Sequence, residues 1–211
     1  MTTIYPIEQM LLPVYCEQVA QAVREGAVIA FATDTVYGIG ANAFDEKAIE
    51  RIYQLKQRPS TMALQILVAQ AQVAKELVQW NEAAEKLAQA YWPGALTLIL
   101  KPNEKGQNLR RGFEGLGLRV PAQPALLHLL HRLEMPLAST SANIHGQAVW
   151  TKPKDLINSL QDKVDFILTG GVLEAASSSV VSLLGEPTLL REGSLSRHQL
   201  EDTLGYALKE I

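Results

Sequence analysis

The sequence AVIAFATDTVYGIG, residues 27–40, joins a run of apolar residues to a polar segment that contains glycine. Residues 27–32 have the length and the apolar, β-branched character of a buried strand. Residues 33–40 then supply hydroxyls, a carboxylate and two glycines directly behind that strand. Because ligands of α/β proteins collect beyond the ends of strands, this stretch predicts both a fold class and a candidate site.

The alternation of buried strands and amphipathic helices continues along the chain. Further strands are predicted at residues 64–68, 96–100, 116–120, 136–139, 166–168, 179–183 and 188–190. Helices are predicted to end at Gly26, to begin behind Asp45, to cover 82–91 and 125–133, and to begin behind Ser196. Helices interleaved with short strands predict an α/β fold. The hairpin-like spacing of the last strands predicts a mixed sheet, within a single domain of residues 1–211.

Composition and charge narrow the class of protein further. The 211 residues are 47% hydrophobic and 19% charged, which is typical of a globular chain. The net charge of −3 argues against a protein whose main task is non-specific binding to nucleic acid or to an anionic membrane. Cys16 is the single cysteine, which excludes an internal disulfide. Residues 1–10 lack a basic segment, and no apolar stretch could span a bilayer. We therefore expect a soluble, cytoplasmic protein.

The pair Gly38-x-Gly40 imitates a dinucleotide-binding fingerprint and raises the remote alternative of a nicotinamide-dependent oxidoreductase. The fingerprint needs its glycines directly behind a strand, but Gly38 lies well beyond the expected strand end at Ala32. It also needs an acidic residue about 20 positions later, where this chain has Lys56 and Arg58. A strand-to-helix turn that uses flexible glycines is the favoured interpretation.

Two other polar segments are candidate ligand sites. In residues 56–61 (KQRPST), two cations and two hydroxyls follow a helix. Either the cations only complement the helix dipole, or they bind a phosphate or a carboxylate. In residues 139–143 (STSAN), short polar side chains end an apolar strand and could bind ribose, phosphate or a small amino acid. A helix-capping turn explains the second segment equally well.

The C-terminal part of the chain adds hydroxyls at residues 177–179 and a cation, Arg191. Arg119 lies in strand-like, apolar surroundings, so it needs a partner if it is buried. That partner is either an internal carboxylate or an anionic ligand. His128 and His131 share a helix face without companions at metal-ligand spacing, and no metal site is predicted. Residues 102–112 have the polar composition of a mobile loop.

Six segments together resemble the YrdC/TsaC family of threonylcarbamoyl-AMP synthases, in family order from about Gly26 to Gly193. They are residues 33–38 (TDTVYG), 56–59 (KQRP), 92–98 (WPGALTL), 118–121 (LRVP), 139–143 (STSAN) and 190–193 (LREG). The resemblance implies an open, twisted mixed sheet flanked by helices, with a concave, positively lined cavity. It also looks like the short form of the family, without an extra C-terminal domain.

The resemblance implies a nucleotidyltransferase that makes threonylcarbamoyl-AMP and pyrophosphate from L-threonine, bicarbonate or CO₂, and ATP. Mg²⁺ would arrive with ATP, and no tightly bound cofactor is expected. The product would pass to a tRNA threonylcarbamoyl-transferase complex for the threonylcarbamoyladenosine modification of tRNA, with at most weak contact to tRNA and none to membranes. The alternative is a paralogue of the same fold that binds RNA or a nucleotide without synthase activity.

The same resemblance assigns residues to roles. Lys56 and Arg58 would be catalytic. The residues expected to contact threonine are Thr35, Ser141 and Ser178. Those expected to bind ATP are Lys56, Arg58, Thr97, Ser139, Asn143 and Arg191. Arg119 and Asp34 match the motifs, and their roles stay open. Leu67 stands where some members have a histidine that helps to bind threonine.

Overall fold

One mixed β-sheet organises the computed structural model, which describes residues 1–57, 59–144, 146–173 and 176–209. Within these ranges the ten strands follow the order β1-β8-β2-β3-β7-β4-β6-β5-β9-β10. The strands are β1 (Thr3–Pro6), β2 (Ile29–Phe31), β3 (Gly38–Asn42), β4 (Gln65–Leu67), β5 (Leu96–Leu100), β6 (Leu116–Arg119), β7 (Leu137–Ser141), β8 (Phe166–Thr169), β9 (Ser179–Ser182) and β10 (Thr188–Arg191). The predicted α/β class with an open, mixed sheet is confirmed.

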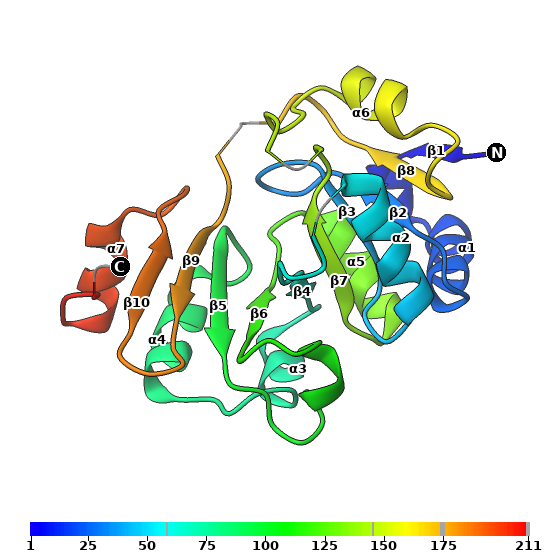
Figure 1. The fold of residues 1–211 in the computed structure, drawn as a ribbon. Coiled ribbons are helices and arrows are strands. Elements are labelled where there is room, and N and C mark those ends of the chain that lie inside the picture. The colour runs from blue at the N-terminus through cyan, green and yellow to red at the C-terminus, as the bar shows by residue number, and fades with distance from the viewer. Residues whose placement is uncertain (58, 145, 174–175, 210–211) are drawn as a thin grey trace.

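Helices flank this sheet (Figure 1). They are α1 (Pro13–Arg24), α2 (Glu46–Lys56), α3 (Ala71–Lys75), α4 (Glu82–Tyr91), α5 (Pro124–Leu133), α6 (Pro153–Leu160) and α7 (Arg197–Leu204), with 3₁₀ turns η1 (Ile7–Leu11) and η2 (Gln107–Leu109). Helix α1 packs against α5, α2 packs on β3, and α4 packs on β5 and α7. In the described part of the chain, no helix combines the length and the apolar character needed to cross a membrane.

Strand directions alternate irregularly across the sheet. The pairs β1–β8, β2–β8, β4–β6 and β5–β9 are parallel, whereas β2–β3, β3–β7, β4–β7, β5–β6 and β9–β10 are antiparallel. The antiparallel pair β9–β10 confirms the hairpin predicted near the C-terminal end.

Helix boundaries follow the sequence signals. Gly26 ends α1 with φ +96°, a conformation that side chains disfavour. Asp45 caps α2, because its carboxylate accepts hydrogen bonds from the backbone amides of Lys47 and Ala48 at 2.9 and 3.0 Å. Ser196 and Gln199 form a reciprocal capping box at the start of α7. These three predicted boundaries are confirmed.

The glycine segment departs from its prediction. Gly38 and Gly40 lie inside β3, between β2 and β7, rather than in a strand-to-helix turn. A Cβ atom on Gly38 would lie 2.8 Å from the Phe31 ring, and one on Gly40 would lie 2.9 Å from the backbone oxygen of Ala138. The glycines are therefore explained by close packing, which corrects the flexible-turn interpretation and removes the geometry of a dinucleotide fingerprint.

Two more differences concern segments outside the predicted elements. Strand β1 and helices α3 and α6 were not predicted from the sequence. The expected mobile loop, residues 102–112, is tied down in its first half: Asn103 N donates to Leu77 O at 3.0 Å, and Val78 forms a β-bridge with Pro102. The short turn η2 follows.

Alternation along the strands separates an apolar face from a polar one. Leu98 and its cross-strand neighbour Leu118 belong to the buried core. On the opposite face of the same strands lie Thr97 and Gly117, and Gln65 is the cross-strand neighbour of Gly117. This second face combines small and polar side chains with the aliphatic Ile99 and Val180, and the candidate site is built on it.

Candidate functional site

A cleft of about 280 Å³ lies over the polar face of the sheet. It is lined by Thr35, Val36, Ala63, Leu64, Gln65, Thr97, Ile99, Gly115, Gly117, Arg119, Ser139, Thr140, Ser141, Ser177, Ser178, Val180 and Arg191. Seven residues singled out from the sequence are among them, although they span 157 positions of the chain, from Thr35 to Arg191. Among these described lining residues, two are arginines and none carries a carboxylate.

The first wall of the cleft is the loop of residues 33–37, between β2 and β3. Its shape is fixed by Thr33, whose hydroxyl accepts from the amides of Thr35 and Val36 at 3.0 and 3.1 Å and donates to Val36 O at 2.6 Å. The Tyr37 hydroxyl, at the end of the loop, bonds with the backbone oxygens of Gly170 and Gly171 at 3.0 and 2.9 Å. Loop 33–37 is therefore held by hydrogen bonds on both sides.

Arg119 connects this loop to strand β6. Its guanidinium lies 2.7 Å from Asp34 Oδ1 and donates to Thr35 Oγ1 at 3.0 Å and to Gly94 O at 2.9 Å. The Arg119 side chain is 5% exposed and that of Asp34 is 15% exposed. The internal carboxylate, one of the two partners that the sequence left open, is thus present. Burial lowers the pKa of Arg119, and the Asp34 charge acts in the opposite direction.

The second wall consists of Ser177, Ser178, Val180 and Arg191; we call it the β9–β10 wall. Arg191 donates from Nε and Nη2 to Ser178 O at 3.1 and 2.9 Å, and from Nη2 to Ser178 Oγ at 3.2 Å. Burial, together with repulsion from Arg119, lowers the pKa of Arg191. In the described ranges no carboxylate forms an ion pair with Arg191, so its positive charge is not offset by one there.

The floor of the cleft contains a chain of hydrogen bonds that the sequence analysis missed. Gln65 Nε2 donates to Thr97 Oγ1, which lies 3.0 Å from Ser178 Oγ. Gln65 was included only in an apolar strand, 64–68. A single polar residue in that run was the available signal, because a lone glutamine in a buried strand needs a partner.

Lys56, the last residue of α2, is 2% exposed and does not line the cleft. Its ammonium donates to the backbone oxygens of Ser141 and Asn143, and it lies 3.5 Å from Asn143 Oδ1. The Asn143 amide in turn donates to Ile144 O at 3.1 Å. Lys56 and Asn143 therefore shape the turn behind β7, beside the cleft. The other predicted catalytic residue, Arg58, falls outside the described residues.

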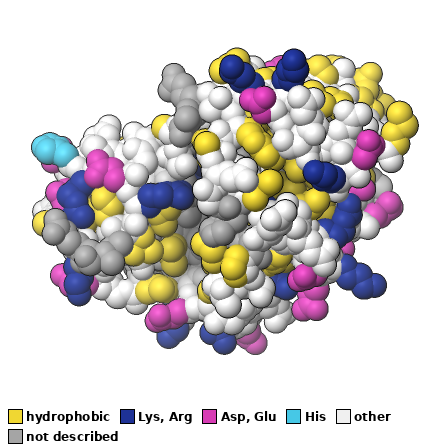
Figure 2. All heavy atoms as spheres, turned by 45° about the horizontal axis from the view of Figure 1, so that its top comes forward, with side chains coloured by type: hydrophobic (Ala, Val, Ile, Leu, Met, Phe, Trp, Pro, Cys, Tyr) yellow, Lys and Arg dark blue, Asp and Glu magenta, His cyan; other side chains and the backbone are white. Residues whose placement is uncertain are grey.

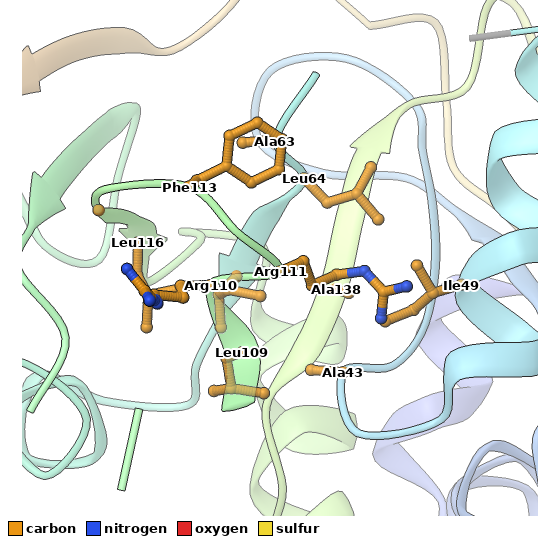
Figure 3. A pocket seen from close by; sticks show the side chains of 12 residues that line it. Ala43, Ile49, Ala63, Leu64, Leu109, Arg110, Arg111, Phe113, Leu116 and Ala138 are labelled. Atoms are coloured by element: carbon orange, nitrogen blue, oxygen red, sulfur yellow. The ribbon is translucent and has the colours of Figure 1, made fainter. Parts of the chain in front are cut away.

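A second pocket of about 10 Å³ adjoins the cleft and shares Ala63, Leu64 and Gly115 with it. That volume is close to the minimum for one water molecule. Figure 3 shows Phe113 next to Ala63, and the side chains of Arg110 and Arg111 extending in opposite directions, Arg111 toward Ile49 of α2. These two cations therefore do not converge on a shared anion.

Two other features bear on what the protein could bind: the charge on its surface and its potential metal ligands. In Figure 2, Lys, Arg, Asp and Glu side chains are scattered over the visible face, without one continuous basic patch. In the residues that the structure describes, no group of three or more His, Cys, Asp and Glu side chains could hold a metal ion. His128 Nδ1 instead lies 2.6 Å from Met10 O.

Known proteins resemble this chain in sequence over most of its length. The chain is 38% identical over 190 residues to the threonylcarbamoyl-AMP synthase of Pyrococcus abyssi and 37% identical over 196 residues to that of Bacillus subtilis. These matches cover 87% and 89% of this chain but only 55% and 57% of the two relatives. The chain thus spans little more than half the length of these curated relatives.

A solved structure agrees with the sequence matches. The structure of P. abyssi Sua5 complexed with L-threonine superposes with a TM-score of 0.87 and 34% identity, over 99% of this chain and 61% of that one. The Sua5/YciO/YrdC family model, described as telomere recombination, matches residues 21–193, which is most of the chain. The resemblance inferred from the six motifs is confirmed, and the chain belongs to the Sua5/YciO/YrdC family.

Proposed function

We propose that this protein is a threonylcarbamoyl-AMP synthase, which forms threonylcarbamoyl-AMP and pyrophosphate from L-threonine, bicarbonate or CO₂, and ATP. One observation carries the proposal: residues that the resemblance assigns to threonine and to ATP line the same cleft. The names of the curated relatives and the threonine complex of P. abyssi Sua5 support it.

The proposed chemistry is a transfer of the adenylyl group. The amine of L-threonine combines with CO₂ to give a carbamate. A carbamate oxygen then forms a bond to the α-phosphorus of ATP, and the bond from that phosphorus to the bridging oxygen breaks, so that pyrophosphate leaves. No covalent enzyme intermediate is needed. The protein contributes by holding the reactants in line and by stabilising the negative charge.

The residues of the cleft are suited to these tasks. Arg191, whose charge no described carboxylate offsets, is the proposed contact for the ATP phosphates, with Ser139 beside it. Thr97 supports this side of the cleft through its hydrogen bond with Ser178, which Arg191 also contacts. Thr35, fixed by Arg119 and Thr33, and the hydroxyls of Ser141 and Ser178 are the proposed contacts for threonine. Arg119 and Asp34 act as positioning residues in this proposal, because their charges are already paired with each other.

Lys56, Arg58 and Asn143 complete the proposed ATP-binding set. Lys56 is held by two backbone oxygens, so binding of phosphate by its ammonium requires the turn behind β7 to move or to share that group. Mg²⁺ enters in the proposal as part of the substrate, MgATP, and neutralises phosphate charge. The residues of this chain bind and orient the nucleotide around it.

The proposed product needs a partner that uses it. Threonylcarbamoyl-AMP is a reactive mixed anhydride, so we propose that it passes to a transferase complex that modifies tRNA in the cytoplasm. We propose at most weak contact between this chain and tRNA, in keeping with the net charge of −3 and with the scattered charges on the face shown in Figure 2.

The decisive experiment measures pyrophosphate. Purified protein is incubated with MgATP, bicarbonate and L-threonine, and pyrophosphate release that requires both threonine and bicarbonate is the expected result. Nucleotide binding without threonine-dependent release would contradict the synthase and favour the binding-module alternative. The variant Lys56→Ala is expected to abolish release, and a thermal unfolding scan tests whether the loss reflects unfolding.

A further inference from the structure

The hydrogen bonds on the floor of the cleft have a direction, and Gln65 sets it. The Nε2 group of Gln65 can only donate, so Thr97 Oγ1 accepts from it. The hydroxyl hydrogen of Thr97 is then available for Ser178 Oγ, 3.0 Å away. Gln65, Thr97 and Ser178 therefore form a relay in which each group donates to the next.

Arg191 completes the arrangement at the far end of the relay. Its Nη2 group donates to Ser178 Oγ at 3.2 Å, so Ser178 accepts from both Thr97 and Arg191. A serine hydroxyl has two acceptor lone pairs and one hydrogen. With both lone pairs used, the hydrogen of Ser178 is the part of the group that remains for a ligand, and Ser178 lines the cleft.

The strand between Gln65 and Thr97 makes the relay possible. Strand β6 lies between β4 and β5, and its residue next to Gln65 is Gly117. A Cβ atom on Gly117 would be 3.4 Å from the Thr97 methyl group. Because Gly117 has no side chain, the Gln65 amide reaches across one strand to the next.

We propose that Gln65 is a positioning residue that fixes Ser178 as a hydrogen-bond donor to an acceptor oxygen of the bound amino acid. The carboxylate is the strongest acceptor that a free amino acid carries, so the relay favours its binding. This inference rests on the proposed function, in which Ser178 contacts threonine, and it adds a residue that the family resemblance does not assign.

The variant Gln65→Glu tests the direction of the relay. A glutamate carboxylate only accepts, so Thr97 would donate to it and accept from Ser178, which would consume the Ser178 hydrogen. We expect the KM for L-threonine to rise about tenfold, the loss of one hydrogen bond to a charged group, while the KM for ATP stays within about twofold. Gln65→Leu, which leaves Thr97 free to rotate, should give a smaller rise, about threefold. The exposed Gln72→Glu in α3 is the matched control and should change neither value.

The outcomes separate this inference from its alternatives. Equal increases of both KM values would indicate plain charge repulsion and would overturn the relay, as would an unchanged threonine KM in a folded Gln65→Glu protein. If Gln65→Glu fails to fold, Thr97→Val takes its place. Adding Gln65→Leu to Thr97→Val should then raise the KM for L-threonine no further. Additive increases of that KM would overturn the relay.

Binding of L-threonine is also measured directly, by calorimetry. Wild-type protein that binds threonine without releasing pyrophosphate would contradict the synthase alone, whereas protein that binds no threonine would contradict both.

Discussion

The two walls of the cleft hold their arginines in different ways. Beside loop 33–37, Arg119 of β6 is buried and its charge is matched by Asp34 of the loop at 2.7 Å. On the β9–β10 wall, Arg191 is anchored to the backbone and hydroxyl oxygens of Ser178, which are dipoles and not charges. Both arginines orient a hydroxyl that faces the cleft, Thr35 in one case and Ser178 in the other.

This difference indicates that the two arginines have different roles. A buried arginine with a carboxylate partner contributes rigid geometry but little attraction for an anion, because the pair is nearly neutral from outside. An arginine fixed only by dipoles keeps its full charge available for a ligand. The positive character of the cleft should therefore come from Arg191, and the fixed shape of loop 33–37 from Arg119. Substitutions on the two walls should then change different measured quantities.

The largest expected effect is on stability, at Asp34. Asp34→Ala leaves the Arg119 guanidinium buried without a counter-charge and should lower the free energy of unfolding by about 3 kcal/mol. Urea denaturation measures this. Glu82→Ala, which breaks the exposed Lys86–Glu82 pair, is the control and should leave the unfolding midpoint close to that of the wild type. An equally small change for Asp34→Ala would show that the two walls do not differ as described.

The next effect should appear in nucleotide binding, at Arg191. Arg191→Ala removes the cation that no described carboxylate offsets, and the KM for ATP should rise about 30-fold, which corresponds to about 2 kcal/mol. Arg191→Lys keeps the charge but loses the paired donors, so its effect should be intermediate. The free energy of unfolding, measured by urea denaturation, should fall much less for Arg191→Ala than for Asp34→Ala. A large stability loss with normal ATP binding would reverse the assignment of the two walls.

The smallest expected effect concerns the Tyr37 hydroxyl, which ties loop 33–37 to Gly170 and Gly171. Tyr37→Phe should cost about 1 kcal/mol of stability, measured by urea denaturation, because the two backbone oxygens lose the one hydrogen they share and the Gly170 amide loses its acceptor. Burial raises the pKa of Tyr37 above its usual 10.0. The folded protein therefore keeps a proton that the unfolded chain releases, and wild-type stability should fall as the pH rises above about 10. Tyr37→Phe should show a shallower fall, and identical pH profiles would contradict this origin.

The sequence predicted the parts of the fold that depend on apolar patterning. Runs such as residues 96–100 and 116–120 became strands because their alternating leucines pack into one core. Strand β3 was missed because its glycines have low strand propensity and are selected by the Phe31 ring that packs against them. Strand β1 was missed because it has only four residues and alternates between exposed and half-buried positions.

Most residues of the candidate site could be predicted from the sequence, but the contacts between them could not. The motifs named Asp34 and Arg119 separately, but their ion pair joins residues 85 positions apart, and no local pattern reveals such a pair. Gln65 was missed for a related reason. Its partner, Thr97, lies two strands away, and the contact depends on a glycine in the strand between them. Strand order decides such contacts, and the motifs alone did not supply it.

The position of β8 has a consequence for how the chain folds. Strand β8, residues 166–169, lies between β1 and β2 and pairs with both. Those two are the first strands of the chain. During synthesis β1 and β2 leave the ribosome long before β8 exists, so each has an unpaired edge for most of that time. We expect this half of the sheet to close late and slowly, because its central strand must bridge more than 130 residues of intervening chain.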